Sequence, residues 1–165
     1  MPKITPFLWF DHQAEEAAQF YVSLFPNSKI LGLTHYGKAG AEASGRAAGS
    51  VMTVAFELDG QQFTALNGGP VFHFTPAISL FIHCQTQAEV DELWEKLSEG
   101  GRKGQCGWLE DKYGVSWQVV PVPFIEILME GDDEDERAMK ALLKMKKLDL
   151  ETLQKAREPG ARTSN

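Results

Sequence analysis

The histidines are the first residues to consider for chemistry, because imidazole both transfers protons and binds metals. The chain has four, His12, His35, His73 and His83. No two of them have the i, i+4 spacing of one helix face or the i, i+2 spacing of one strand face. A metal site would have to be assembled from distant segments, so the sequence favours ordinary surface or hydrogen-bonded histidines.

Two acidic residues, Glu110 and Asp111, lie beside Tyr113 at the end of an expected strand. Such a carboxylate could act as a general base, although a polar pair on a surface turn is the interpretation that we favour. Ser116 and Cys106 fall inside expected strands and not on exposed nucleophile turns. The sequence therefore indicates neither a serine nor a cysteine hydrolase site.

The segment Asn67-Gly68-Gly69-Pro70 follows an expected strand. Its two glycines allow the backbone to approach a ligand closely, and the Asn67 side chain could reach the mouth of a cavity. The same residues could form a turn and nothing more. No lysine or helix start follows them, so the segment is not typical of a phosphate-binding loop.

Short apolar runs and one amphipathic segment make up the first half of the chain. We expect strands at residues 4–10, 29–36, 51–58 and 61–66, and a helix at residues 11–24 with Asp11 as its N-cap. Asp59-Gly60 is the two-residue signal of a hairpin between the last two strands. Residues 37–49 are rich in glycine, alanine and serine, which predicts a mobile loop.

The same order of elements restarts after Pro76. We expect strands at residues 78–84, near 105–110 and at 116–120. Between the first two, a capping box predicts the start of a helix, and its apolar face is Val90, Leu93, Trp94 and Leu97. The chain therefore contains a strand-helix-strands unit twice, at residues 4–67 and 77–121, which predicts an α+β fold. We expect both units to form one domain, residues 1–125.

Residues 126–165 differ from both units and predict a helical tail. An acidic run that begins at Asp132 starts one helix, and the segment Lys144-Met145-Lys146-Lys147 ends it. Acidic residues at the start and basic residues at the end are the order that the helix dipole favours. Its apolar stripe is Ala138, Leu142 and Met145. A second short helix is expected from Asp149 to about residue 156.

Composition limits the class of protein. The net charge of −7 over 165 residues disfavours a nucleic-acid partner, which needs clustered lysine and arginine. No apolar run approaches the roughly 18 residues of a membrane span, and the N-terminus lacks the apolar core of a signal peptide. The two cysteines, Cys84 and Cys106, form no secreted-type disulfide framework, so we expect inert thiols and a cytoplasmic protein.

Several segments together resemble one family. They are Leu66-Asn67-Gly68-Gly69-Pro70, Ile78-Ser79, Cys106-Gly107-Trp108, Ser116-Trp117-Gln118-Val119-Val120-Pro121 and Met145-Lys146-Lys147. They resemble the demethylubiquinone methyltransferase-like branch of the vicinal oxygen chelate (glyoxalase/bleomycin-resistance/dioxygenase) superfamily, over nearly the whole chain including the tail. The resemblance implies two βαβββ modules, each curved around a cavity.

In metal-using members of that superfamily, each module supplies two metal ligands. The resemblance places the corresponding positions at Thr5 and Thr64 in the first module and at Ser79 and Gln118 in the second. The position at Thr64 could instead fall one residue away, at Phe63 or Ala65. Two threonines, a serine and a glutamine cannot neutralise a divalent transition metal, which prefers imidazole, thiolate or carboxylate. We therefore expect the cavity without a metal and without any other cofactor.

Strand alternation adds two aromatic residues to this cavity. Trp9 shares parity with Thr5, and Phe81 shares parity with Ser79. With Asn67 at its mouth, the cavity would be apolar with a few hydrogen-bonding groups, as small-molecule sites usually are. The same side chains could also simply fill a small barrel.

Three functions follow as alternatives. The first, which we favour, is a metal-free protein that binds a small, partly aromatic molecule. The second is an enzyme on a small carbonyl or aromatic, quinone-like substrate, which includes the demethylubiquinone methyltransferase activity in the name of the resembling branch. The third is a regulatory or structural dimer. S-adenosylmethionine enzymes of the common type place a glycine-rich turn between a strand and a helix, and none follows a strand here. We expect a homodimer with the tail helix packed across the subunit boundary, and neither a nucleic-acid nor a membrane partner.

Overall fold

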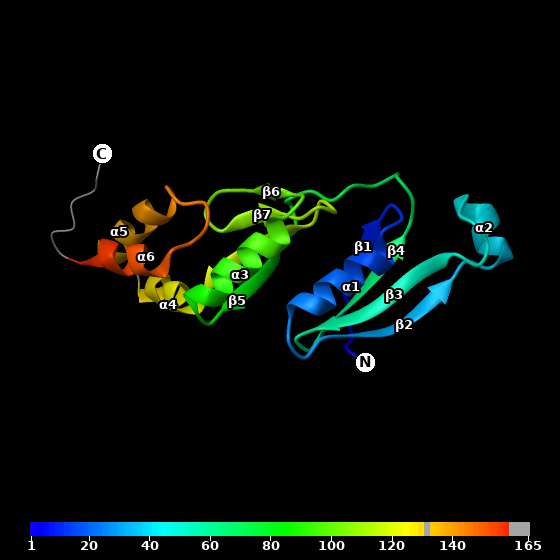
Figure 1. Ribbon diagram of the computed structural model, residues 1–165, viewed down its shortest axis with the longest axis horizontal. Coiled ribbons are helices and arrows are strands. Elements are labelled where there is room, and N and C mark those ends of the chain that lie inside the picture. The colour runs from blue at the N-terminus through cyan, green and yellow to red at the C-terminus, as the bar shows by residue number, and fades with distance from the viewer. Residues whose placement is uncertain (131–132, 159–165) are drawn as a thin grey trace. The chain divides into compact units, whose positions relative to one another are not determined.

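Two four-stranded sheets form the framework of the computed structural model, one from each half of the repeat (Figure 1). The structure describes residues 1–130 and 133–158. The chain divides into two compact units, the first ending at Phe74 and the second beginning at Thr75. The expectation that residues 1–125 form one domain stays a prediction. Within the described residues, no helix is both long and apolar enough to span a bilayer.

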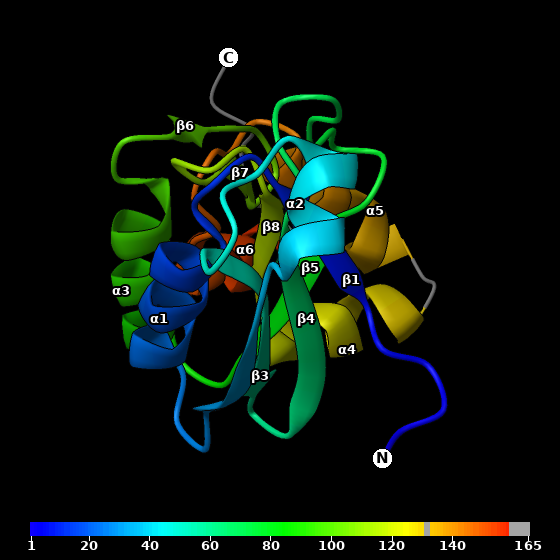
Figure 2. The ribbon, with the colours of Figure 1, turned by 90° about the vertical axis from the view of Figure 1, so that its right-hand side faces the viewer.

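The first unit is a βαβββ module with one insertion. Its elements are β1 Phe7–Phe10, α1 Ala14–Leu24, β2 Lys29–His35, α2 Lys38–Ser44, β3 Val51–Leu58 and β4 Gln61–Asn67. The strand order is β1-β4-β3-β2, with β1 parallel to β4 and the other pairs antiparallel. The short helix α2 stands at the end of β2 and β3, away from α1 (Figure 2).

The second unit repeats this topology and adds three helices. Its elements are β5 Leu80–Cys84, α3 Gln87–Ser98, β6 Arg102–Lys103, β7 Trp108–Glu110, β8 Ser116–Pro121, α4 Val122–Glu130, α5 Asp133–Leu142 and α6 Leu150–Arg157. The strand order is β5-β8-β7-β6, with β5 parallel to β8. The expected α+β architecture of two βαβββ modules with C-terminal helices is confirmed.

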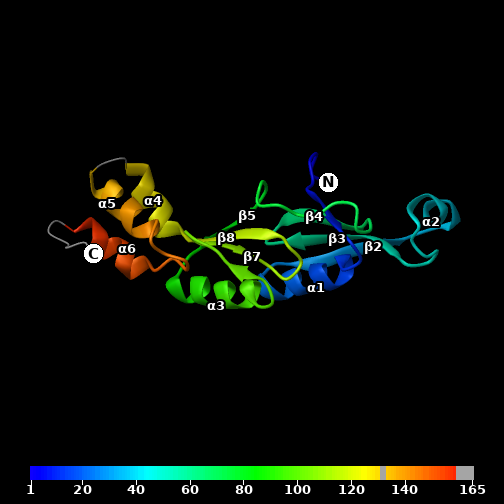
Figure 3. The same ribbon diagram turned by 90° about the horizontal axis from the view of Figure 1, so that it is seen from above.

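Each sheet buries one face under its long helix (Figure 3). In the first unit, α1 packs over β3 and β4, and the ring of Tyr21 lies 6.4 Å from that of Phe56, measured between centroids. Tyr21, Val54, Phe56 and Ala65 are all fully buried. In the second, α3 covers buried Leu109, Trp117 and Val119. Because side chains alternate along a strand, the intervening residues lie on the opposite face of each sheet, called the distal face below.

Local turn signals are confirmed where the hydrogen bonds are local. Asp59 and Gly60 have positive φ of 45° and 83°, as the expected hairpin requires. Thr86 caps α3 by accepting a hydrogen bond from the Glu89 amide at 3.2 Å. The Glu89 carboxylate in turn accepts from the backbone of Gln85.

Two expectations at the start of the first unit are wrong. The first strand begins at Phe7 and not at residue 4, because Pro6 has no amide hydrogen to donate to a ladder. Asp11 does not cap α1. The Asn67 carboxamide oxygen accepts from the Ala14 amide at 2.8 Å and supplies that cap from the end of β4.

The expected mobile loop at residues 37–49 contains α2, because its alanine, lysine and glutamate residues are strong helix formers.

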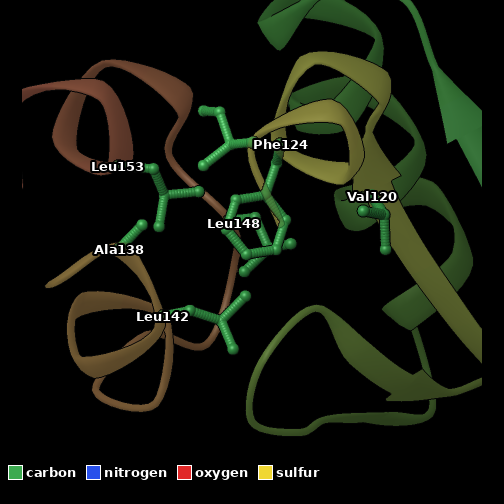
Figure 4. Packing of buried hydrophobic residues seen from close by; sticks show 7 residues of the cluster. Val120, Phe124, Ala138, Leu142, Leu148 and Leu153 are labelled. Atoms are coloured by element: carbon green, nitrogen blue, oxygen red, sulfur yellow. The ribbon is translucent and has the colours of Figure 1, made fainter. Parts of the chain in front are cut away.

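The C-terminal helices build a second hydrophobic core within their own chain (Figure 4). Ala138 and Leu142 of α5 pack with residues of β8, α4, α6 and the connection before α6, namely Val120, Phe124, Ile127, Leu148 and Leu153. Met145 packs against this cluster. The apolar stripe of the tail is therefore covered inside the subunit, so the expectation that it needs a subunit boundary is wrong. The expected helix start at residue 132 lies outside the described residues.

Two hydrogen bonds and an ion pair attach the tail to α3. The Gln87 amide group donates to the Leu148 carbonyl at 2.9 Å and accepts from the Leu150 amide at 2.8 Å. A hydrogen bond from Lys147 lowers the pKa of Asp91. Asp149 caps α6 as expected, and the hydrogen bond that it accepts from the Thr152 backbone lowers its pKa.

Helix α4 has no clear signal in the sequence. This helix follows β8 directly and carries Pro123 in its first turn, where the missing amide hydrogen costs nothing. Its residues are apolar on most sides, and a short apolar run has no clear period. Burial of Phe124 and Ile127 against the other tail helices decides the conformation.

Candidate ligand-binding faces

A row of three side chains crosses the distal face of the second sheet. The strand register aligns Phe81 of β5 with Gln118 of β8, and Gln118 with Trp108 of β7. The Gln118 amide nitrogen donates to the Ser79 hydroxyl oxygen at 2.9 Å. The two positions that the resemblance assigned to this module are thus brought together, between two aromatic rings of which Phe81 is 42% exposed.

A polar row lies beside the aromatic row. Glu110 pairs in the register with Ser116 on one side and with Arg102 on the other. The Arg102 guanidinium donates to the Glu110 carboxylate at 2.8 Å, which raises the pKa of Arg102. A hollow of about 280 Å³ opens here, lined by these three residues and by Trp108, Lys103 and Pro76.

His83 lies on the same distal face, although the sequence favoured an ordinary surface or hydrogen-bonded histidine there. It is exposed, and its ring centroid lies 4.9 Å from that of Phe81. The signal was present in the sequence, since His83 has the same parity as Ser79 and Phe81, but a lone histidine near a strand end is not specific. His83 pairs in the register with Val120, which is part of the tail cluster. The tail helices therefore bound this end of the distal face.

Asp111 is not the surface residue that the sequence favoured. Its side chain is 2% exposed, and its carboxylate accepts from the backbone amides of Tyr113 and Val115 and from the Trp117 indole at 2.9–3.0 Å. A carboxylate that is buried among so many donors holds the β7–β8 turn and orients Trp117. Glu110 is half-buried and ion-paired. These hydrogen bonds and this ion pair give no indication that Asp111 or Glu110 acts as a general base.

The distal face of the first sheet carries Trp9 and Thr64. Thr64 pairs with Phe7, which is 60% exposed, whereas its neighbours Phe63 and Ala65 are buried on the helix side. Of the three positions left open by the resemblance, Thr64 therefore has the distal orientation. Thr5 precedes β1 and is partly exposed. That these residues line a cavity stays a prediction.

The Asn67-Gly68-Gly69-Pro70 segment has a structural role in this unit. Asn67 faces α1, and besides capping that helix it donates to the Val51 carbonyl at 3.1 Å. A β-carbon on Gly68 would lie 2.2 Å from the Trp9 ring, so only glycine fits there. The Trp9 indole donates to the Gly69 carbonyl at 2.9 Å. The Asn67 side chain points away from the distal face, contrary to the expectation that it reaches a cavity.

The donor set does not suit the metal that the superfamily resemblance would imply. Ser79 and Gln118 offer neutral oxygen and nitrogen atoms, and these two side chains bond to each other. Within residues 1–130 and 133–158, no three histidine, cysteine or acidic side chains gather closely enough to hold an ion. Burial raises the pKa of the Cys84 thiol to about 12, which leaves it protonated and a poor ligand.

The chain is similar to one protein-family model and to several solved structures. Residues 2–120 match the family model described as 3-demethylubiquinone-9 3-methyltransferase. The PhnB protein of Bacillus cereus is 39% identical, with a TM-score of 0.65 over 73% of this chain and 99% of that chain. A Staphylococcus aureus protein is 33% identical over 72% of this chain and 94% of its own, with a TM-score of 0.33. Protein PA1353 of Pseudomonas aeruginosa shares the fold at 20% identity, with a TM-score of 0.59 over 73% and 98% of the two chains.

The match to the family model ends where the tail begins. The family model stops at residue 120, whereas α4, α5 and α6 lie within residues 122–157. The expectation that the resemblance extends through the tail is therefore wrong. Among proteins with curated descriptions, none matches the sequence.

Proposed function

We propose that this chain, which belongs to the 3-demethylubiquinone-9 3-methyltransferase family, binds a small planar molecule. The molecule lies on the distal face of the second sheet, and no metal takes part in its binding. The observation that carries the proposal is the Phe81–Gln118–Trp108 row with Ser79 bonded to Gln118. Two aromatic rings beside a few oriented polar groups is the usual composition of a small-molecule site.

The Ser79–Gln118 pair leaves defined hydrogen-bonding capacity. Since the Gln118 nitrogen donates to the Ser79 oxygen, the serine hydroxyl hydrogen and the second amide hydrogen remain for other acceptors. The Gln118 carboxamide oxygen remains for a donor. A ligand with a carbonyl group on a planar ring uses these donors while its ring packs on Phe81 or Trp108.

The family name by itself does not support methyl transfer by this chain. The connections from strand to long helix are Asp11-His12-Gln13 in the first module and Gln85-Thr86 in the second, and neither contains glycine. Binding of S-adenosylmethionine by the common fold uses a glycine-rich connection at that point. The proposed ligand is therefore a small carbonyl compound, with quinones included in the class.

His83 supports a second candidate function. Its ring lies on the same face as Phe81 and is accessible. A histidine beside a bound carbonyl compound can act as a general acid or general base. This would make the protein an enzyme on the same class of ligand.

We further propose a cytoplasmic homodimer. Two free cysteines support a reducing compartment. Edge strand β1 carries Phe7, 60% exposed, and an exposed apolar residue on an edge strand favours association. Because the tail stripe is covered within the chain, the interface belongs to the sheets. Removal of residues 122–165 should then leave a dimer in sedimentation, and a monomer would contradict this.

The test of ligand binding uses 2-methyl-1,4-naphthoquinone, an uncharged planar carbonyl compound. We expect its titration to shift the NMR signals of the Gln118 carboxamide and the Trp108 indole. Gln118→Ala should weaken binding by about tenfold, which corresponds to about 1.4 kcal/mol. Gln105→Ala, at an exposed glutamine of the same unit, is the control and should bind as the unaltered protein. Unmoved Gln118 and Trp108 signals would refute the site.

A further inference from the structure

The hollow at one end of the distal face carries an arginine that is only partly engaged. Arg102 is 79% exposed in its side chain and makes its one described ion pair with Glu110. That pair uses one guanidinium nitrogen. A guanidinium has five N–H donors arranged as a fork that matches a carboxylate. Arg102 therefore keeps donors that face solvent at the edge of the hollow.

Local charge at the hollow differs from that of the whole chain. Its charged lining residues are Arg102, Lys103 and Glu110, two cations and one anion, whereas the chain as a whole has a charge of −7. The Lys103 ammonium group donates a hydrogen bond to the Glu95 carboxylate of α3 at 2.9 Å. Of the two cations that line the hollow, Arg102 is thus the one on the distal face. An exposed pair such as Arg102–Glu110 is easily rearranged because it is worth little in water.

The position of Arg102 relative to the aromatic row defines a shape. Glu110, its cross-strand partner, lies two residues from Trp108 on β7, so the two side chains share a face at a spacing of about 7 Å. Gly104 approaches the Trp108 backbone and donates to its carbonyl at 2.8 Å, which fixes this hairpin. A ring that packs on Trp108 therefore places a substituent at its edge within reach of Arg102.

We propose that the ligands of this face are planar aromatic carboxylates, with the ring on Trp108 and the carboxylate on Arg102. This inference rests on the proposed function, because it uses the same face and adds the charge of the ligand. It separates carboxylates from neutral quinones, which the Ser79–Gln118 pair alone does not distinguish.

The experiment compares 2-naphthoate with 2-naphthamide, which have the same ring and nearly the same shape but differ in charge. Titrations followed at the Trp108 indole should give a dissociation constant at least about tenfold lower for the naphthoate. Arg102→Gln should remove this preference, because it weakens binding of the naphthoate far more than binding of the naphthamide. Lys96→Gln, which removes a cation of α3 outside the site, should keep the preference and controls for net charge. Because Arg102 is exposed, its variant should retain the thermal midpoint of the unaltered protein.

The outcomes separate this inference from the function beneath it. If both naphthyl compounds bind equally and move the Gln118 and Trp108 signals, the carboxylate inference is overturned while the ligand face stands. A preference that survives in Arg102→Gln also overturns it. If neither these compounds nor the naphthoquinone moves those signals, both proposals fall.

Discussion

Substitution of Gly68 by alanine tests how the glycine motif positions Trp9. Gly68 has no positive φ, so its backbone accepts an alanine without strain. The added β-carbon would lie 2.2–2.6 Å from three atoms of the Trp9 ring, where carbon atoms normally keep about 3.5–4.0 Å. The indole must therefore move by about 1 Å or more, away from the place where its N–H donates to the Gly69 carbonyl.

The cost of that movement follows from the contacts that are lost. Overpacking typically costs about 1–3 kcal/mol, and the indole hydrogen bond contributes about 1 kcal/mol. Phe72 packs edge-on against Trp9 with ring centroids 4.9 Å apart, a contact worth about 0.5–1.5 kcal/mol that is partly retained. We expect Gly68→Ala to lower the free energy of unfolding by about 2–4 kcal/mol.

The assay is urea unfolding followed by far-ultraviolet circular dichroism. Gly32→Ala is the matched control, because Gly32 also has no positive φ and a β-carbon there meets nothing within 4 Å. Both substitutions restrict the unfolded chain equally, so their difference isolates the clash. In a Trp9→Ala background, Gly68→Ala should cost little, which a double-mutant cycle measures. If Gly68→Ala and Gly32→Ala are equally stable, the explanation of the motif is refuted.

Three further predictions concern the tail and the cofactor. Gln87→Ala removes the hydrogen bonds to Leu148 and Leu150, so it should destabilise the tail by about 1–3 kcal/mol, and unchanged hydrogen exchange at the Leu150 amide would contradict this. Asp91 and Asp149 have pKa values below the ordinary 3.8, so their stabilisation is complete above that value and is lost as pH falls through the lowered pKa values of the folded state. Acid titration should accordingly loosen the tail only below about pH 4, and loosening between pH 5 and 7 would show that other groups control it. Calorimetry should detect no binding of S-adenosylmethionine, and micromolar affinity would restore the methyltransferase interpretation.

Elements held by local interactions could be read from the sequence. The β3–β4 hairpin follows from Asp59-Gly60, whose positive φ values need no distant partner. The start of α3 follows from Thr86 and Glu89, whose capping bonds span three or four residues. The distal orientation of Gln118 and Phe81 follows from strand alternation and is seen in the register.

The remaining features depend on residues far apart in the chain. Asn67 caps α1 across 53 positions, and Gly68 is required by a tryptophan that lies in β1. The sequence favoured a surface turn for Asp111, whereas in the structure its carboxylate is buried and accepts from the Trp117 indole. The sequence by itself determined the repeated module and the parity of its strands, because periodicity and short-range hydrogen bonds are local. Tertiary structure alone decided which polar groups are consumed by packing and which, such as Arg102 and Gln118, lie on the distal face, because a hydrogen bond across the sheet leaves no pattern in the order of residues.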